Sequence, residues 1–124
     1  MGGSVSISDQ ERRSRLARRH RLAPHARSDD VAAVTRSLVG LHSSDPVTVY
    51  LSAAQRMRHG SLTAVDDALY QERSVVRHHA MRRTLWVMPL DIAMAAHSAS
   101  TSGLVKHERM RLANSLVVSG VTDD

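Results

Sequence analysis

The chain contains no cysteine and no phenylalanine, and its aromatic side chains are one tryptophan and two tyrosines. The absence of cysteine excludes disulfides and thiolate metal sites, and it favours a cytoplasmic setting over an oxidising compartment. With so few rings, leucine, valine, alanine and methionine must supply the buried apolar area. A core rich in alanine and leucine favours helices over a β-sandwich.

Long hydrophobic runs are missing as well. No apolar run approaches the roughly 20 residues needed to span a bilayer, and the N-terminus lacks the apolar stretch of a signal peptide. We therefore expect a protein that neither spans a membrane nor is exported by that route. The length of 124 residues suits one domain with its own core.

Lysine is nearly absent although the chain is strongly basic. The chain carries 17 lysines and arginines and a net charge of +5, and Lys106 is its only lysine. The positive charge is therefore almost wholly guanidinium, which suits contacts with phosphates and base edges. The base composition of the genome can also favour arginine over lysine, so composition alone does not establish a nucleic-acid partner.

Histidine is abundant, with eight residues, and this raises the question of a metal site. The adjacent His78 and His79 are expected to point to opposite faces of a strand. The sequence offers no His-x-x-x-His pair and no cysteine to complete a tetrahedral site. We therefore predict no metal site and no cofactor.

Helix signals fill the first half of the chain. Ser8 and Glu11 have the spacing of a capping box, which predicts a helix from Asp9 to about Leu22. The outer face of this helix is very basic, and a solvated surface is its simplest interpretation.

A second helix is expected to begin at Ser28, with Asp29 and Asp30 in its first turn. Its apolar face would comprise Val31, Val34, Leu38 and Leu41. Asp45 and Pro46 are a typical N-cap and first helical residue, and they predict a third helix that runs to about His59. A short fourth helix is expected from Thr63 through Tyr70.

A change of pattern then predicts two strands, Val75–Met81 and Thr84–Met88, with Arg82 and Arg83 as the tight connection between them. Asp91 is expected to open another helix, and small residues at 98–103 predict a break before a last helix at about 105–116. The predicted fold class is mainly α with a small β-hairpin, a winged helix-turn-helix. We expect one such domain at residues 1–118 and a linker, or the start of a following domain, at 119–124.

Three motifs carry a family resemblance. They are Val39-Gly40-Leu41-His42-Ser43-Ser44-Asp45-Pro46, Ala68-Leu69-Tyr70-Gln71-Glu72-Arg73-Ser74-Val75-Val76-Arg77 and Ala80-Met81-Arg82-Arg83-Thr84-Leu85-Trp86-Val87-Met88-Pro89. In order and separation they resemble a bacterial winged-helix DNA-binding-domain family that includes the AlkZ/YcaQ-like DNA glycosylases. That family's usual pattern has Gly where this chain has Arg83.

The resemblance implies a longer protein in which tandem winged-helix domains cup a DNA duplex, this segment being the first. In the members that act as glycosylases, a Gln-x-Gln or Gln-x-Asp pair in the first motif positions the water that attacks the anomeric carbon of a damaged nucleoside. His42 and Ser44 occupy these two positions here. Asp45 is better explained as an N-cap than as a catalytic carboxylate.

The departure from the family pattern limits the enzyme interpretation. A protonated imidazole would oppose the cationic, sugar-centred transition state, so His42 can act only when it is neutral. Ser44 is too short and too weakly basic to reproduce a second glutamine. Three functions stay open: a DNA-binding module without chemistry of its own, a glycosylase that uses His42 and Ser44, and a transcription regulator.

Double-stranded DNA is the expected partner, and the hairpin is the expected place of contact. Arg82 and Arg83 at its tip, together with Arg77 on a strand, would meet phosphates or a minor groove, and Arg36 is a further candidate. The alternative for these arginines is a charged edge strand that prevents pairing between molecules. Trp86 could stack on an extruded base, but it is better explained as a core residue.

Overall fold

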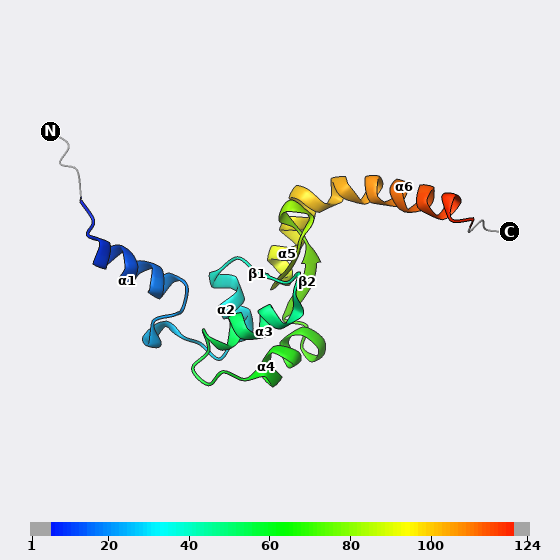
Figure 1. Ribbon diagram of the computed structural model, residues 1–124. Helices are drawn as coiled ribbons and strands as arrows, with labels where there is room; N and C mark the ends of the chain where they lie inside the picture. Colours follow the sequence, from blue (N-terminus) through cyan, green and yellow to red (C-terminus); the bar gives the residue numbers. More distant parts are fainter. Residues whose placement is uncertain (1–5, 121–124) are drawn as a thin grey trace.

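The computed structural model describes residues 6–120, in which helices pack against a small sheet and the first and last helices project from this body (Figure 1). The helices are α1 (Asp9–Arg19), α2 (Val31–Ser37), α3 (Pro46–Ala54), α4 (Leu62–Asp66), α5 (Leu90–Ala96) and α6 (Ser102–Val118). The strands are β1 (Leu41–His42), β2 (Val75–His79) and β3 (Leu85–Pro89). Single turns of 3₁₀- or π-helix are η1 (Pro24–Ala26), η2 (Asp67–Gln71), η3 (Met81–Arg83) and η4 (His97–Thr101). The expected class, mainly helical with a small antiparallel sheet, is confirmed, and the arrangement is consistent with a winged-helix-like fold.

Two helix starts follow the sequence prediction. The backbone N–H of Glu11 donates to Ser8 Oγ at 3.2 Å, so Ser8 caps α1. The backbone N–H of Val47 donates to Asp45 Oδ1 at 3.0 Å, so Asp45 caps α3 ahead of Pro46. Each cap satisfies a backbone donor that the first turn of a helix leaves without a partner.

The predicted start of the second helix was wrong by two residues. Asp30 caps α2 by accepting from the N–H of Ala33 at 3.0 Å, and Ser28 Oγ accepts from the N–H of Asp30 instead. Asp29 lies outside the helix because its carboxylate accepts the N–H of His59 at 2.9 Å, a partner 30 residues away. Both Ser and Asp are good N-caps, so only this tertiary contact selects between them.

Two further helix limits also differ from expectation. The third helix ends at Ala54 rather than near His59, and Ser61 rather than Thr63 caps α4. After α4 the chain continues without a break into the π-turn η2.

The sheet has three antiparallel strands in the order β1-β3-β2, so β3 lies in the centre. The β2–β3 hairpin was predicted, but β1 was not, because Leu41 was assigned to a helix face. Leu41 instead pairs with Val87, and His42 pairs with Trp86. Gly40 permits this close approach, since a Cβ there would lie 3.3 Å from the Val87 carbonyl oxygen.

The core lies on both faces of β3, because alternate residues of a strand point to opposite sides. On one face Val87 packs with Leu41 and Val75 against the buried residues of α2, α3 and α4. On the other face Met88 packs against Ala93 of α5, with Trp86 half-buried beside them.

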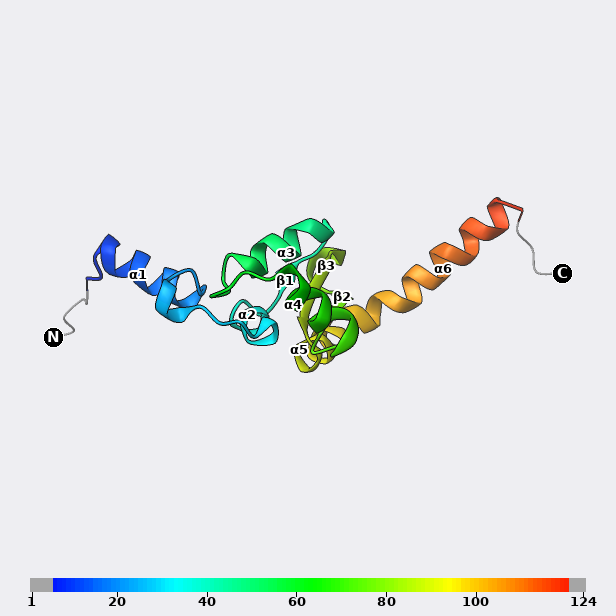
Figure 2. The ribbon, with the colours of Figure 1, turned by 90° about the horizontal axis from the view of Figure 1, so that it is seen from below.

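The ends of the described chain lie far apart. In the two ribbon views α1 and α6 leave the central body at opposite ends (Figures 1 and 2). The expected break at residues 98–103 was wrong, because η4 and α6 form one continuous helical run. None of the residues of α6 is buried. Of the linker predicted at 119–124, Ser119 and Gly120 form a turn after α6, and the other four residues lie outside the described part.

Candidate nucleic-acid interface

The tip of the β2–β3 hairpin presents two adjacent arginines to solvent. Arg82 and Arg83 are exposed, and both have left-handed backbone conformations, with φ of 57° and 59°. The turn is closed by hydrogen bonds from the N–H of Arg83 to the Ala80 carbonyl at 3.2 Å and from the N–H of Ala80 to the Thr84 carbonyl at 3.1 Å. A left-handed residue other than glycine costs roughly 1–2 kcal/mol, so the turn holds these side chains in place at an energetic cost.

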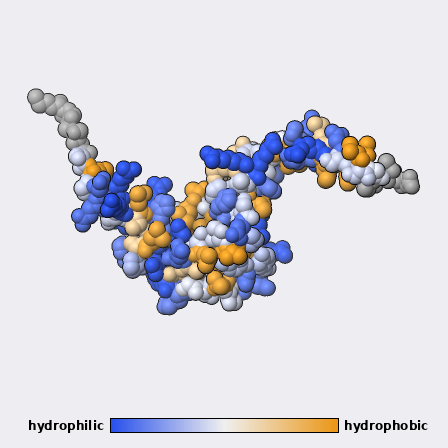
Figure 3. Space-filling view, in the orientation of Figure 1, coloured by the Kyte–Doolittle hydropathy of each residue, from blue (hydrophilic) through white to orange (hydrophobic). Residues whose placement is uncertain are grey.

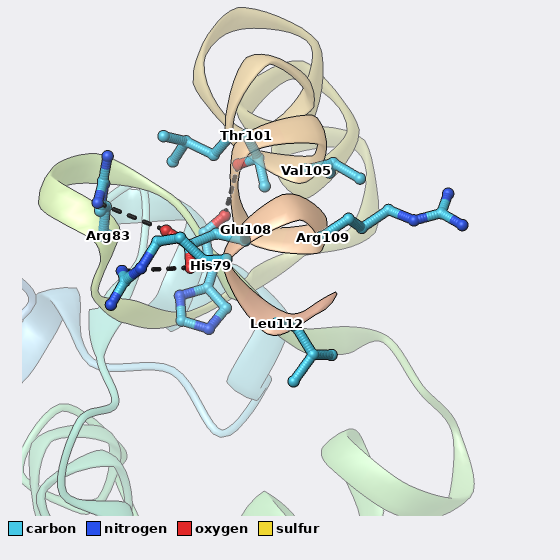
Figure 4. Close-up of a pocket in the computed structure, with 9 residues that line it drawn as sticks. His79, Arg83, Thr101, Val105, Glu108, Arg109 and Leu112 are labelled. Carbon is cyan, nitrogen blue, oxygen red and sulfur yellow. Dashed lines mark hydrogen bonds and ion pairs between the residues drawn. The ribbon is translucent and has the colours of Figure 1, made fainter. Parts of the chain in front are cut away.

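A cavity of about 620 Å³ lies between the hairpin tip and α6 (Figure 4). Its charged lining residues are Arg83, Glu108, Arg109 and Arg111, with the imidazole of His79 beside them. Leu104, Val105 and Leu112 supply apolar surface. The lining thus combines three guanidiniums with one carboxylate, and its net charge is suited to an anionic group.

Two ion pairs and one hydrogen bond shape this cavity. Glu108 lies between Arg83 at 3.4 Å and Arg111 at 3.5 Å, both ion pairs being largely exposed. The Thr101 hydroxyl is buried and donates to the His79 carbonyl at 2.7 Å, which joins η4 to β2. The start of α6 is therefore tied to the hairpin while its later turns extend into solvent.

Arg77 is exposed, yet its side chain also makes a hydrogen bond within the fold. Its Nε donates to the hydroxyl of Ser43 at 2.8 Å, and Ser43 is only 1% exposed. The bond connects β2 to the segment that follows β1. Arg77 and His79 are two residues apart on β2, so they face the same side of the strand.

Arg36 is engaged within the molecule. Its guanidinium makes a two-pronged contact with the Asp91 carboxylate, with both N–O distances at 2.8 Å. This contact raises the pKa of Arg36 and lowers the pKa of Asp91. An exposed ion pair of this kind contributes little to stability, so the guanidinium can leave Asp91 for another anionic partner at small cost.

His42 and Ser44 lie together on the surface. His42 Nε2 and Ser44 Oγ are 3.3 Å apart, and both residues are exposed. The His42 ring stands edge-on to Trp86, with centroids 5.2 Å apart and planes at 87°. Both carboxylate oxygens of Asp45 are engaged. Oδ1 caps α3, and Oδ2 accepts the Thr48 hydroxyl at 3.2 Å.

Trp86 belongs to a row of rings that sequence reasoning did not identify. Its neighbours across the sheet are His42 on β1 and His78 on β2, and His97 of η4 lies beyond His78. The ring nitrogens of His78 and His97 are 3.3 Å apart. Burial is the main reason why the pKa of His78 is lowered, with a smaller contribution from the nearby charge of His97.

The hairpin register would have placed His42, Trp86 and His78 on one row if β1 had been recognised. His97 lies 19 residues beyond His78, and no sequence pattern connects the two. In the part of the chain from residue 6 to residue 120, no group of three or more potential metal ligands is close enough to hold an ion. No helix in that part is long and apolar enough to cross a membrane.

Comparison with known proteins points to one family. A family model described as DNA glycosylase AlkZ-like matches residues 35–117, about two thirds of the chain. This range contains β1, the hairpin and most of α6. No curated protein and no solved structure matches the chain. The chain belongs to the AlkZ-like DNA glycosylase family.

Proposed function

We propose that the chain is a winged-helix domain that docks on double-stranded DNA, with the β2–β3 hairpin as its wing. It would serve a longer DNA-binding or repair protein, as the family resemblance implies, without chemistry of its own. Family membership supports a role connected with DNA binding or repair. That role also fits the cytoplasmic setting that the cysteine-free composition predicts.

The observation that carries this proposal is the conformation of the hairpin tip. Arg82 and Arg83 lie in the turn, beyond the last paired residues His79 and Leu85. Their place in the turn argues against the charged edge strand as the explanation for these two residues, whereas that alternative stays open for Arg77 on the edge strand β2. Two exposed guanidiniums, held by a turn whose backbone conformation is costly, are suited to phosphates or to a narrow minor groove.

A salt series tests this proposal directly. We would measure the affinity of the whole chain for an undamaged duplex, comparing the wild type with the double variant Arg82→Gln/Arg83→Gln. Each lost phosphate contact should lower the slope of log affinity against log salt by about 0.9, or roughly 1.8 for both. Arg73→Gln/Lys106→Gln removes the same charge elsewhere and should leave the slope close to the wild-type value. A chain without salt-dependent affinity at low ionic strength would contradict the proposal.

A second function, base excision, is favoured by the pairing of His42 with Ser44. The two side chains occupy the positions of the family's water-orienting pair, and their 3.3 Å contact places a ring nitrogen beside a hydroxyl on an open surface. A neutral imidazole there could orient a water and accept its proton. The Trp86 ring supports the imidazole from one side.

Incubation with alkylated or crosslinked duplex tests the second function. Base release that is lost in His42→Ala and retained in His42→Gln, which restores the family's amide, would support it. Binding without any release would leave the docking function alone. A regulator, the third possibility, would instead select one defined sequence from random duplexes.

A further inference from the structure

Helix α1 carries a concentration of positive charge and contributes no buried residue to the core. Arginine occupies five of its eleven positions. It precedes the part of the chain that the family model matches. In the space-filling view, hydrophilic side chains predominate at this end of the molecule, with some hydrophobic surface among them (Figure 3).

Four of these arginines form one stripe. At 100° per residue, Arg12, Arg15 and Arg19 lie within about 60° of one another, and Arg18 lies about 60° further round. From Arg12 to Arg19 the stripe is about 10 Å long, at 1.5 Å per residue. This length corresponds to roughly three nucleotides of a strand at 3.4 Å each. Arg13 points about 100° away from Arg12, on the other side of the helix.

The stripe contains one carboxylate, that of Glu11, which lies between Arg15 and Arg18 around the helix. Arg15 pairs with Glu11 at 2.6 Å, and this pairing lowers the pKa of Glu11. Within residues 6–120, the guanidiniums of Arg12, Arg18 and Arg19 have no hydrogen bond and no ion pair, although the nearby charge of Arg18 also helps to lower the pKa of Glu11. Like charges so close together repel one another, so the stripe favours an anionic partner that can neutralise it.

The C-terminal end of α1 is joined to the body of the protein. Arg56, half-buried in the segment after α3, donates to the carbonyl of His20 at 3.0 Å and to that of Ser52 at 2.7 Å. Burial lowers the pKa of Arg56. Side chains from the last turn of α1 and from the end of α2 line one shared hollow. The end of the stripe at Arg19 therefore lies beside the body of the protein, and Arg12 lies toward the free end of the helix.

We infer that α1 is a second DNA-binding element, which contacts backbone phosphates of the duplex through Arg12, Arg15, Arg18 and Arg19. The inference rests on the proposed DNA-docking function and extends the interface beyond the hairpin. Guanidiniums contact phosphates without reading the sequence, so α1 supplies affinity and orientation but not specificity. Its distance from the hairpin lengthens the stretch of duplex that one chain covers.

The test compares two triple variants of the whole chain. Arg12→Gln/Arg18→Gln/Arg19→Gln removes the unpaired charges of the stripe, and glutamine has nearly the same helix propensity as arginine. Arg13→Gln/Arg73→Gln/Lys106→Gln removes the same charge elsewhere. The stripe variant should lower the salt slope for an undamaged duplex by about 2.7, so that the wild type loses roughly 40-fold more affinity than this variant between 50 and 200 mM salt.

Circular dichroism should show equal helix content in both variants and the wild type. An unchanged slope in the stripe variant, with DNA binding intact, refutes the role of α1 and leaves the hairpin proposal standing. No DNA affinity in the wild type refutes both. Binding to vesicles of phosphatidylserine and phosphatidylcholine that only the stripe variant loses, with its DNA slope unchanged, would make α1 a membrane-surface helix and overturn the inference.

Discussion

Replacement of Arg83 by glycine should stabilise the protein while it weakens DNA binding. Arg83 has a φ of 59°, a conformation that costs an L-residue roughly 1–2 kcal/mol and costs glycine almost nothing. The change also removes the ion pair with Glu108, which at 3.4 Å and with more than half of the arginine side chain exposed contributes about 0.2–1 kcal/mol. The backbone effect is the larger of the two, so a net gain of about 0.5–1 kcal/mol is expected.

Arg83→Ala is the matched control, because it removes the same side chain but keeps the unfavourable backbone. We expect the alanine variant to be neutral or slightly destabilised, and about 1 kcal/mol less stable than the glycine variant. Urea denaturation measures the difference as a shift in midpoint at constant slope. For a domain of this size the melting temperatures should differ by roughly 4 °C.

The reasoning fails if the alanine variant is as stable as the glycine variant, because the turn would then store no backbone strain. The two variants should lose DNA affinity equally, since both lack the guanidinium. A glycine variant that binds DNA like the wild type would show that Arg83 does not touch the duplex. The family's usual glycine at this position would then have only a conformational purpose.

The remaining predictions concern stability and titration. Asp45→Ala should cost about 1 kcal/mol in urea denaturation through loss of the α3 cap, and Asp45→Asn should retain most of that stability; equal losses would argue against capping. Val49→Ala should cost about 2 kcal/mol, because Val49 is fully buried, whereas Val47→Ala on the same helix, where the valine is 60% exposed, should cost little; similar losses would contradict the assigned core. The hydrogen bond to Asp66 raises the pKa of Tyr50 from 10.0 to about 12, so its contribution to stability is fully present below pH 10 and is lost as the pH rises through 12; absorbance titration at 295 nm should show a late transition that Tyr50→Phe removes, and its persistence in that variant would refute the assignment.

Local signals allowed much of the fold to be predicted. The caps at Ser8 and Asp45 and the two hairpin strands depend on residues within a few positions of one another. The small residues at 98–103 misled the prediction, because without a proline they do not stop a helix whose backbone hydrogen bonds can continue. The cap of α2 was misassigned because a distant histidine engages Asp29.

Long-range contacts account for what the sequence could not indicate at the candidate site. Strand β1 has two residues, too few for a periodic pattern, and its existence depends on β3 lying beside it. The bond between Arg77 and Ser43 joins residues 34 apart, and the Arg36–Asp91 pair joins residues 55 apart. The sequence therefore proposed contact residues for DNA, and it could not show which of them already have partners within the chain.

The pairing of β1 with β3 has a consequence for the order of folding. The β2–β3 hairpin closes over a few residues, whereas β1 must find β3 across more than forty intervening positions. Closing the longer loop costs more chain entropy, so we expect the hairpin to form first and the segment with His42 and Ser44 to dock late. Substitutions that weaken the hairpin would then also disturb the positions of His42 and Ser44, since β1 needs β3 as its pairing partner.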